Sequence, residues 1–157
     1  MSVDTVNIAE VERILGYTFN DPALLITALT HKSYANEHRT ECNGRLEYLG
    51  DSVLNLVVAE RLFRARPDEE GVLTELRQHI VSRVPLAVAV RNMGLLSYYR
   101  LGKGAKEGIE GFGIKPTSDI FEAALGAIYL DGGMDSARKF VEEHLLTVMA
   151  EQCIAQN

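Results

Sequence analysis

Apolar residues recur three and four positions apart along nearly the whole chain, the spacing that places them on one side of an α-helix. The alternation of apolar and polar residues that marks a half-buried strand does not persist over several positions. We therefore predict an all-α fold. The composition agrees, because 157 residues, 46% of them hydrophobic and 24% charged, suit one globular domain with a sizeable core.

Glycines, prolines and polar turns divide this pattern into helices. The predicted helices cover 8–15, 21–31, 44–66, 72–93, 116–130 and 135–149. Pro67 should end the third helix, and Pro85 should kink or split the fourth before Leu86. The polar segment 36–43 is predicted to be a loop. Residues 100–115 hold five glycines and no apolar periodicity, and we expect a mobile loop there.

Charge, cysteines and hydropathy narrow the range of functions. Sixteen Lys and Arg against 22 Asp and Glu give a formal charge of −6, so any contact with nucleic acid must be local. Two cysteines, Cys42 and Cys153, form neither a disulfide framework nor a metal-binding spacing, and we expect a cytoplasmic protein. The sequence shows no secretion signal, no apolar run near ~18 residues and no phosphate-cradling glycine motif, so neither a membrane nor a small-molecule cofactor is expected.

Two pairs of acids stand at helical spacing. Glu47 and Asp51 are four residues apart, and Asp119 and Glu122 are three apart, so each pair shares one side of its helix. Between the first two lies Gly50, which costs ~1 kcal/mol relative to Ala inside a helix. A close approach by another backbone or by a ligand would explain that glycine. Asp119 alone is equally well explained as an acid favoured by the dipole of a first helical turn.

If the two helices pack with these pairs facing each other, four carboxylates converge. Each like pair ~5 Å apart then repels by roughly 3 kcal/mol at an effective dielectric near 20, which favours a bound cation. Oxygen ligands without sulfur or imidazole select Mg²⁺ or Mn²⁺, and such ions promote phosphodiester hydrolysis. The alternative to a metal site is that these acids belong to an ordinary solvated surface. No Glu-x-x-His spacing precedes any of the four histidines, which argues against a di-iron carboxylate protein.

The sequence of residues 45–54, RLEYLGDSVL, resembles the signature of the ribonuclease III catalytic domain. Further similar segments, such as 30–34, 70–73, 99–104 and 118–123, extend the resemblance from about Ile8 to Val148. It implies an all-helical endonuclease that uses Mg²⁺, with Mn²⁺ able to substitute. It also implies a homodimer that cuts double-stranded RNA, with rRNA precursors among the substrates, and leaves short 3′ overhangs. We expect one such catalytic domain over 1–157 and no double-stranded-RNA-binding domain after it.

The resemblance assigns roles residue by residue. Glu47, Asp51, Asp119 and Glu122 match the family's catalytic, metal-binding acids. Glu70 matches a further acid near the site, for which we expect a supporting role; the alternative is an ordinary exposed turn acid.

Other positions concern the partners. Tyr48 stands where the family has an aromatic dimer contact, and the alternative is a half-buried core tyrosine. Basic residues on the glycine-rich segment are candidates to contact RNA phosphates, because A-form RNA is read by shape, phosphates and 2′-hydroxyls. These residues are Arg100, Lys103, Lys106 and Lys115, and for each one ordinary solvation is the alternative.

One position departs from the family pattern. Gly44 stands where the signature usually begins with an acid or amide, so the site lacks one side-chain oxygen. This favours a second hypothesis, a catalytically impaired, dimeric RNA-binding or assembly module that retains the fold. The four principal acids favour the endonuclease.

Overall fold

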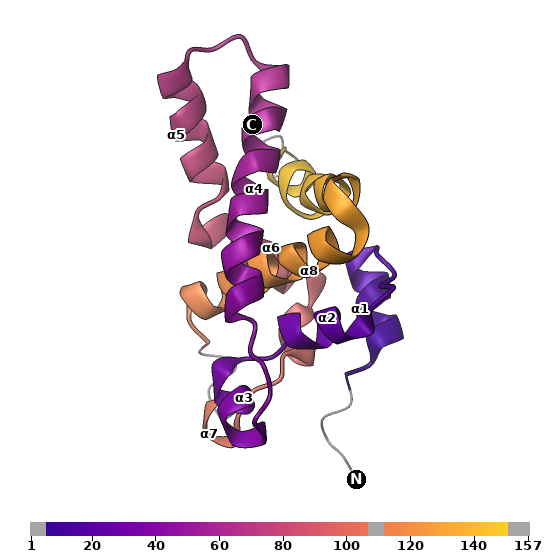
Figure 1. Ribbon diagram of the computed structural model, residues 1–157. Coiled ribbons are helices and arrows are strands. Elements are labelled where there is room, and N and C mark those ends of the chain that lie inside the picture. The colour runs from indigo at the N-terminus through magenta and orange to yellow at the C-terminus, as the bar shows by residue number, and fades with distance from the viewer. Residues whose placement is uncertain (1–5, 107–111, 151–157) are drawn as a thin grey trace.

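The computed structural model describes residues 6–106 and 112–150, and over these ranges the chain is helical, which confirms the predicted fold class (Figure 1). The only strand-like feature within them is an isolated parallel bridge between Thr30 and Arg100. The α-helices are α1 (Ile8–Leu15), α2 (Pro22–Ala28), α3 (Lys32–His38), α4 (Gly44–Ala65), α5 (Glu70–Ile80), α6 (Arg83–Met93), α7 (Lys103–Lys106) and α8 (Ile114–Val141). A 3₁₀ turn, η1 (Leu95–Tyr98), follows α6, and a π-helical turn, η3 (Glu142–Leu146), follows α8.

The two longest helices, α4 and α8, pack across each other at the centre of the molecule (Figure 1). α6 and α2 pack on α8, α5 lies along α4, and α3 lies beside α7 at the opposite end from α5. Most of α8 is enclosed, and Phe121, Leu125 and Ile128 are fully buried. Among the described residues, no helix has the length and hydropathy to cross a membrane.

The second predicted helix is shorter than expected, and the loop after it is partly helical. α2 ends at Ala28 because the backbone next bonds to a distant segment: the carbonyl of Leu29 accepts the N–H of Arg100 at 2.7 Å. A separate helix, α3, then begins at Lys32, where the side chain of His31 accepts the N–H of Ser33. Local apolar spacing contains no information about the Arg100 contact, so the prediction of one helix to residue 31 was wrong. The predicted loop over 36–43 is helical up to His38 and non-helical from 39 to 43.

Two other helix boundaries also differ from the prediction. The break before α6 falls at Val81 and Ser82, and Pro85 lies in the first turn of α6, where a missing N–H is tolerated. α8 begins at Ile114 and continues past Gly132, with a kink at Gly133, whose φ of 81° is non-helical. The segment 100–115 therefore contains α7 and the start of α8, and its residues 107–111 lie outside the described part of the chain.

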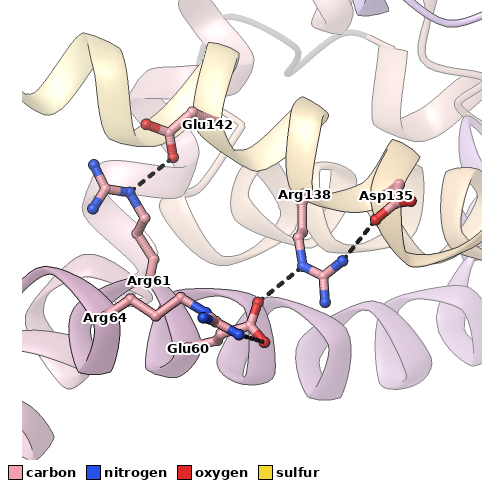
Figure 2. Close-up of polar contacts among 6 residues, drawn as sticks. All are labelled: Glu60, Arg61, Arg64, Asp135, Arg138 and Glu142. Carbon is pink, nitrogen blue, oxygen red and sulfur yellow. Dashed lines mark hydrogen bonds and ion pairs between the residues drawn. The ribbon is translucent and has the colours of Figure 1, made fainter.

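Ion pairs connect the C-terminal half of α4 to the segment that follows the kink at Gly133 (Figure 2). Glu60 of α4 accepts a hydrogen bond from Arg138 of α8 at 3.0 Å, and Arg61 donates to Glu142 at 3.4 Å. Arg138 also pairs with Asp135 at 2.7 Å. All of these side chains are at least partly exposed, so the network contributes modestly to stability.

Candidate metal centre

Two glycines bring α4 and α8 into backbone contact. A Cβ added at Gly50 would overlap the carbonyl oxygen of Glu122 and lie 2.6 Å from its carbonyl carbon. A Cβ added at Gly126 would overlap the carbonyl oxygen of Leu46 and lie 3.2 Å from the nitrogen of Gly50. The glycine inside α4 therefore has the structural reason expected from the sequence, the close approach of another backbone. Gly126 was not singled out from the sequence. A glycine within an otherwise apolar helical stretch could have indicated a second close approach.

This crossing places both acid pairs around one hollow of about 420 Å³. Carboxylate oxygens of Glu47, Asp119 and Glu122 lie within 4.8 Å of one another. Asp51 also lines the hollow, although it is more exposed, and it lies close enough to Glu122 to share a hydrogen bond with it. The four acids singled out in the sequence thus come from two helices and meet in space.

The charges in this cluster are poorly compensated. Burial, together with the charge of Asp51 and a hydrogen bond to it, raises the pKa of Glu122 to about 8. Burial and the neighbouring Asp119 also raise the pKa of Glu47. Such shifts mean that the negative forms are disfavoured at these positions, which a cation in the hollow would reverse. The arrangement suits a divalent metal ion.

One cation already touches the cluster. The ammonium group of Lys115 lies 2.9 Å from a carboxylate oxygen of Asp119, and this pairing raises the pKa of Lys115. Arg83, at the first position of α6, also lines the hollow, and its charge acts on Lys115. Sequence reasoning missed Arg83, because nothing in the local pattern links the start of α6 to the start of α8.

Of the other candidate residues from the sequence, some lie at the hollow and one lies away from it. Tyr48 is 80% exposed at the edge of the hollow, so its interpretation as a half-buried core tyrosine is wrong. Gly44 also lines the hollow. Glu70 lies apart from the four acids, in a groove between α4 and α5, where it accepts a 3.4 Å hydrogen bond from Thr74.

The basic candidates also differ from one another. Lys103 and Lys115 have exposed side chains. The guanidinium of Arg100 is half-buried, donates to Thr30 at 3.0 Å and lies 4.3 Å from the ring centre of Tyr34, so its geometry serves internal contacts. The side chain of Lys106 lies outside the described residues.

Comparisons with known proteins identify the family of this chain. The profile of a family described as Ribonuclease-III-like matches residues 21–149. Ribonuclease 3 of Symbiobacterium thermophilum is 48% identical over 134 residues, which make up 83% of this chain and 56% of that protein. Ribonuclease 3 of Pseudomonas fluorescens is 45% identical over 141 residues, covering 87% of this chain and 58% of that protein. The chain thus spans a little over half the length of these curated relatives.

A solved structure shows the same fold. The nuclease domain of ribonuclease III from Campylobacter jejuni, described for structural flexibility in a region involved in dimer formation, superposes with a TM-score of 0.81 at 36% sequence identity. The match covers 87% of this chain and 94% of that one. Family profile, curated relatives and fold agree with one another, and the chain belongs to the ribonuclease III family.

Proposed function

We propose that this chain is the catalytic part of a divalent-metal-dependent endonuclease that hydrolyses phosphodiester bonds in double-stranded RNA. The observation that carries the proposal is the meeting of Glu47, Asp51, Asp119 and Glu122 around one hollow, with three of them within 4.8 Å of one another. The sequences of the relatives named Ribonuclease 3 support the same activity. We also propose rRNA precursors as one substrate class and the cytoplasm as the location.

The donor set fits Mg²⁺, and Mn²⁺ would substitute for it. Every candidate ligand is a carboxylate oxygen, the donor that these hard ions prefer, and the hollow has room for retained water and a phosphate. When bound, the ion would supply a water of lowered pKa and positive charge to stabilise the leaving oxygen. Glu47, Asp119 and Glu122 would hold the ion, together with the more exposed Asp51 at the edge of the same hollow.

Basic side chains beside the acids would bind the RNA backbone. Lys115 projects into the hollow, and Lys103 is exposed on α7. Contacts to phosphates position a duplex without reading its sequence, which suits a cleft that recognises the shape of A-form RNA. Lys106 and Arg100 stay proposed RNA contacts, and Arg100 would have to reach a phosphate while its guanidinium is engaged by Thr30 and Tyr34.

We propose a homodimer that forms through α4 and α5. α5 carries an apolar stripe but has no buried residue, so its apolar side chains lack a complete partner within one chain. With α4 it borders a groove of about 760 Å³ lined by Leu56, Phe63 and Leu73, and Phe63 is 75% exposed. Tyr48 is likewise exposed on α4, and large exposed apolar side chains that gather on one face are typical of an interface. Since Glu70 lines the same groove, we place its supporting role at the subunit boundary.

Cleavage of long duplex RNA by the purified chain in Mg²⁺ tests the proposal. Glu122→Gln removes a ligand charge but little surface, so it should reduce the cleavage rate by at least ~100-fold and change duplex binding by less than ~3-fold. The control is Glu143→Gln, an exposed acid paired only loosely with Lys139 at 3.9 Å, which should leave both unchanged.

One observation favours the second candidate function: Gly44 borders the hollow and has no side chain that could supply an oxygen. A catalytically impaired RNA-binding or assembly module would bind duplex RNA and dimerise, yet show no cleavage at any Mg²⁺ or Mn²⁺ concentration. That result would replace the endonuclease proposal. Restored cleavage in Gly44→Glu would then identify the missing oxygen as the cause.

A further inference from the structure

A buried polar junction lies beside the start of α4. The N–H of Asn43 donates to the carbonyl of Thr30 at 2.9 Å, and the N–H of His31 donates to the carbonyl of Arg100 at 3.0 Å. Asn43 and Tyr99 are 6% and 7% exposed. Three segments distant in sequence, 28–31, Asn43 and 99–101, are therefore held together away from water.

Asn43 behaves unusually for a residue at a helix N-cap. A side chain at this position commonly accepts a hydrogen bond from the first turn of its helix, but that of Asn43 makes no such bond. Its Nδ2 instead donates to the hydroxyl of Tyr99 at 2.9 Å and to the carbonyl of Ala28 at 3.4 Å. The carbonyl of Asn43 accepts the N–H of Glu47 at 2.9 Å. Two hydrogen bonds thus join Tyr99 to the turn that carries Glu47.

The ring of Tyr99 reaches the start of α8 as well. It packs edge-on against Phe112, with ring centres 5.8 Å apart, and against His31 at 5.7 Å. Phe112 directly precedes Gly113, whose carbonyl accepts both the N–H of Thr117 at 3.2 Å and its hydroxyl at 2.9 Å. These bonds form the first turn of α8, and Asp119 follows in the next turn.

We infer that Tyr99 is a positioning residue that fixes Glu47 relative to Asp119, by its hydroxyl through Asn43 at the start of α4 and by its ring through Phe112 at the start of α8. The inference rests on the proposed metal site. Metal–ligand distances are held within about 0.2 Å, so a small shift of either helix start changes affinity. Residues that orient ligands without touching the ion commonly contribute 10–100-fold to metal affinity.

The test measures Mn²⁺ binding by isothermal titration calorimetry on the whole chain, together with the melting temperature in EDTA. Tyr99→Phe removes one hydroxyl and leaves Nδ2 of Asn43 with a single 3.4 Å contact. We expect the Kd for Mn²⁺ to rise on the order of 10-fold. Tyr98→Phe is the matched control: it removes the same atom from the neighbouring residue, whose hydroxyl makes no hydrogen bond within the described residues, and it should leave the Kd unchanged.

A second variant tests the other half of the connection. Phe112→Leu keeps an apolar side chain but removes the ring contact with Tyr99, and it should also weaken Mn²⁺ binding several-fold. If the Kd of Tyr99→Phe stays within twofold of the wild type while only its melting temperature falls, Tyr99 is merely structural and the inference is overturned. A wild-type chain that binds no Mn²⁺ overturns the proposed function itself, which is a distinguishable result.

Discussion

Replacement of Gly50 by alanine is the most direct test of how the acid pairs are brought together. The added methyl carbon would lie 2.6 Å from the carbonyl carbon of Glu122, whereas ordinary contact begins at 3.4 Å. The backbones of α4 and α8 must therefore separate by at least about 0.8 Å at the crossing. Backbone atoms within a helix cannot rotate away as a flexible side chain can, so the separation disturbs the packing of the core around both helices.

The expected loss of stability follows from this geometry. Overpacking a well-packed core lowers the free energy of unfolding by about 1–3 kcal/mol or more. The higher helix propensity of alanine relative to glycine raises it by only about 1 kcal/mol. Because the clash is with backbone atoms, we expect the overpacking cost to lie at its upper end of about 3 kcal/mol. The net loss of about 2 kcal/mol corresponds to a melting temperature lowered by roughly 4–8 °C in a domain of this size. The same separation moves Glu47 and Asp51 away from Asp119 and Glu122, so affinity for Mn²⁺ should fall at least 10-fold.

Thermal unfolding and Mn²⁺ titration of Gly50→Ala measure both effects, and Gly71→Ala is the control. Gly71 lies on α5 with nothing within 4 Å of an added Cβ, so alanine there should leave the Kd unchanged and raise stability slightly. If Gly50→Ala melts no lower than Gly71→Ala and binds Mn²⁺ as tightly, then the close helix crossing does not set the geometry of the acids.

Two further predictions concern protonation and assembly. The pKa of Glu122 is about 8 in the folded state and near 4.5 in the unfolded state, so between these pH values only the folded state keeps the proton. In EDTA, the melting temperature should therefore fall as the pH rises from about 4.5 to 8. Glu122→Gln should flatten that slope, and an unchanged slope would contradict the assignment of the titration to Glu122. Tyr48→Ala should weaken dimerisation, measured by sedimentation at several concentrations, with little change in the unfolding of the monomer because the side chain is 80% exposed. A dimer of undiminished affinity would exclude Tyr48 from the interface.

The sequence predicted most reliably the helix ends that depend on residues only a few positions apart. Gly16 caps the C-terminus of α1 and Gly94 that of α6, and both glycines have positive φ, 72° and 75°, as expected for left-handed helix caps. α2 begins at Pro22 with Asp21 as its N-cap, within one residue of the predicted start at 21. Such boundaries depend on hydrogen bonds between residues three or four apart, so local residue types carry the necessary information.

The tertiary structure decided the features that depend on distant segments. α2 stops early because the N–H of Arg100 bonds to Leu29, and no local pattern indicates a partner 71 residues away. The two acid pairs were visible in the sequence, but only the backbone contact of α4 and α8 at Gly50 and Gly126 brings them around one hollow. The exposure of Tyr48 likewise became known only from the packing of whole helices. Residue types and their spacing thus determined which side chains have suitable chemistry, and packing between segments far apart in the chain determined which of those side chains meet.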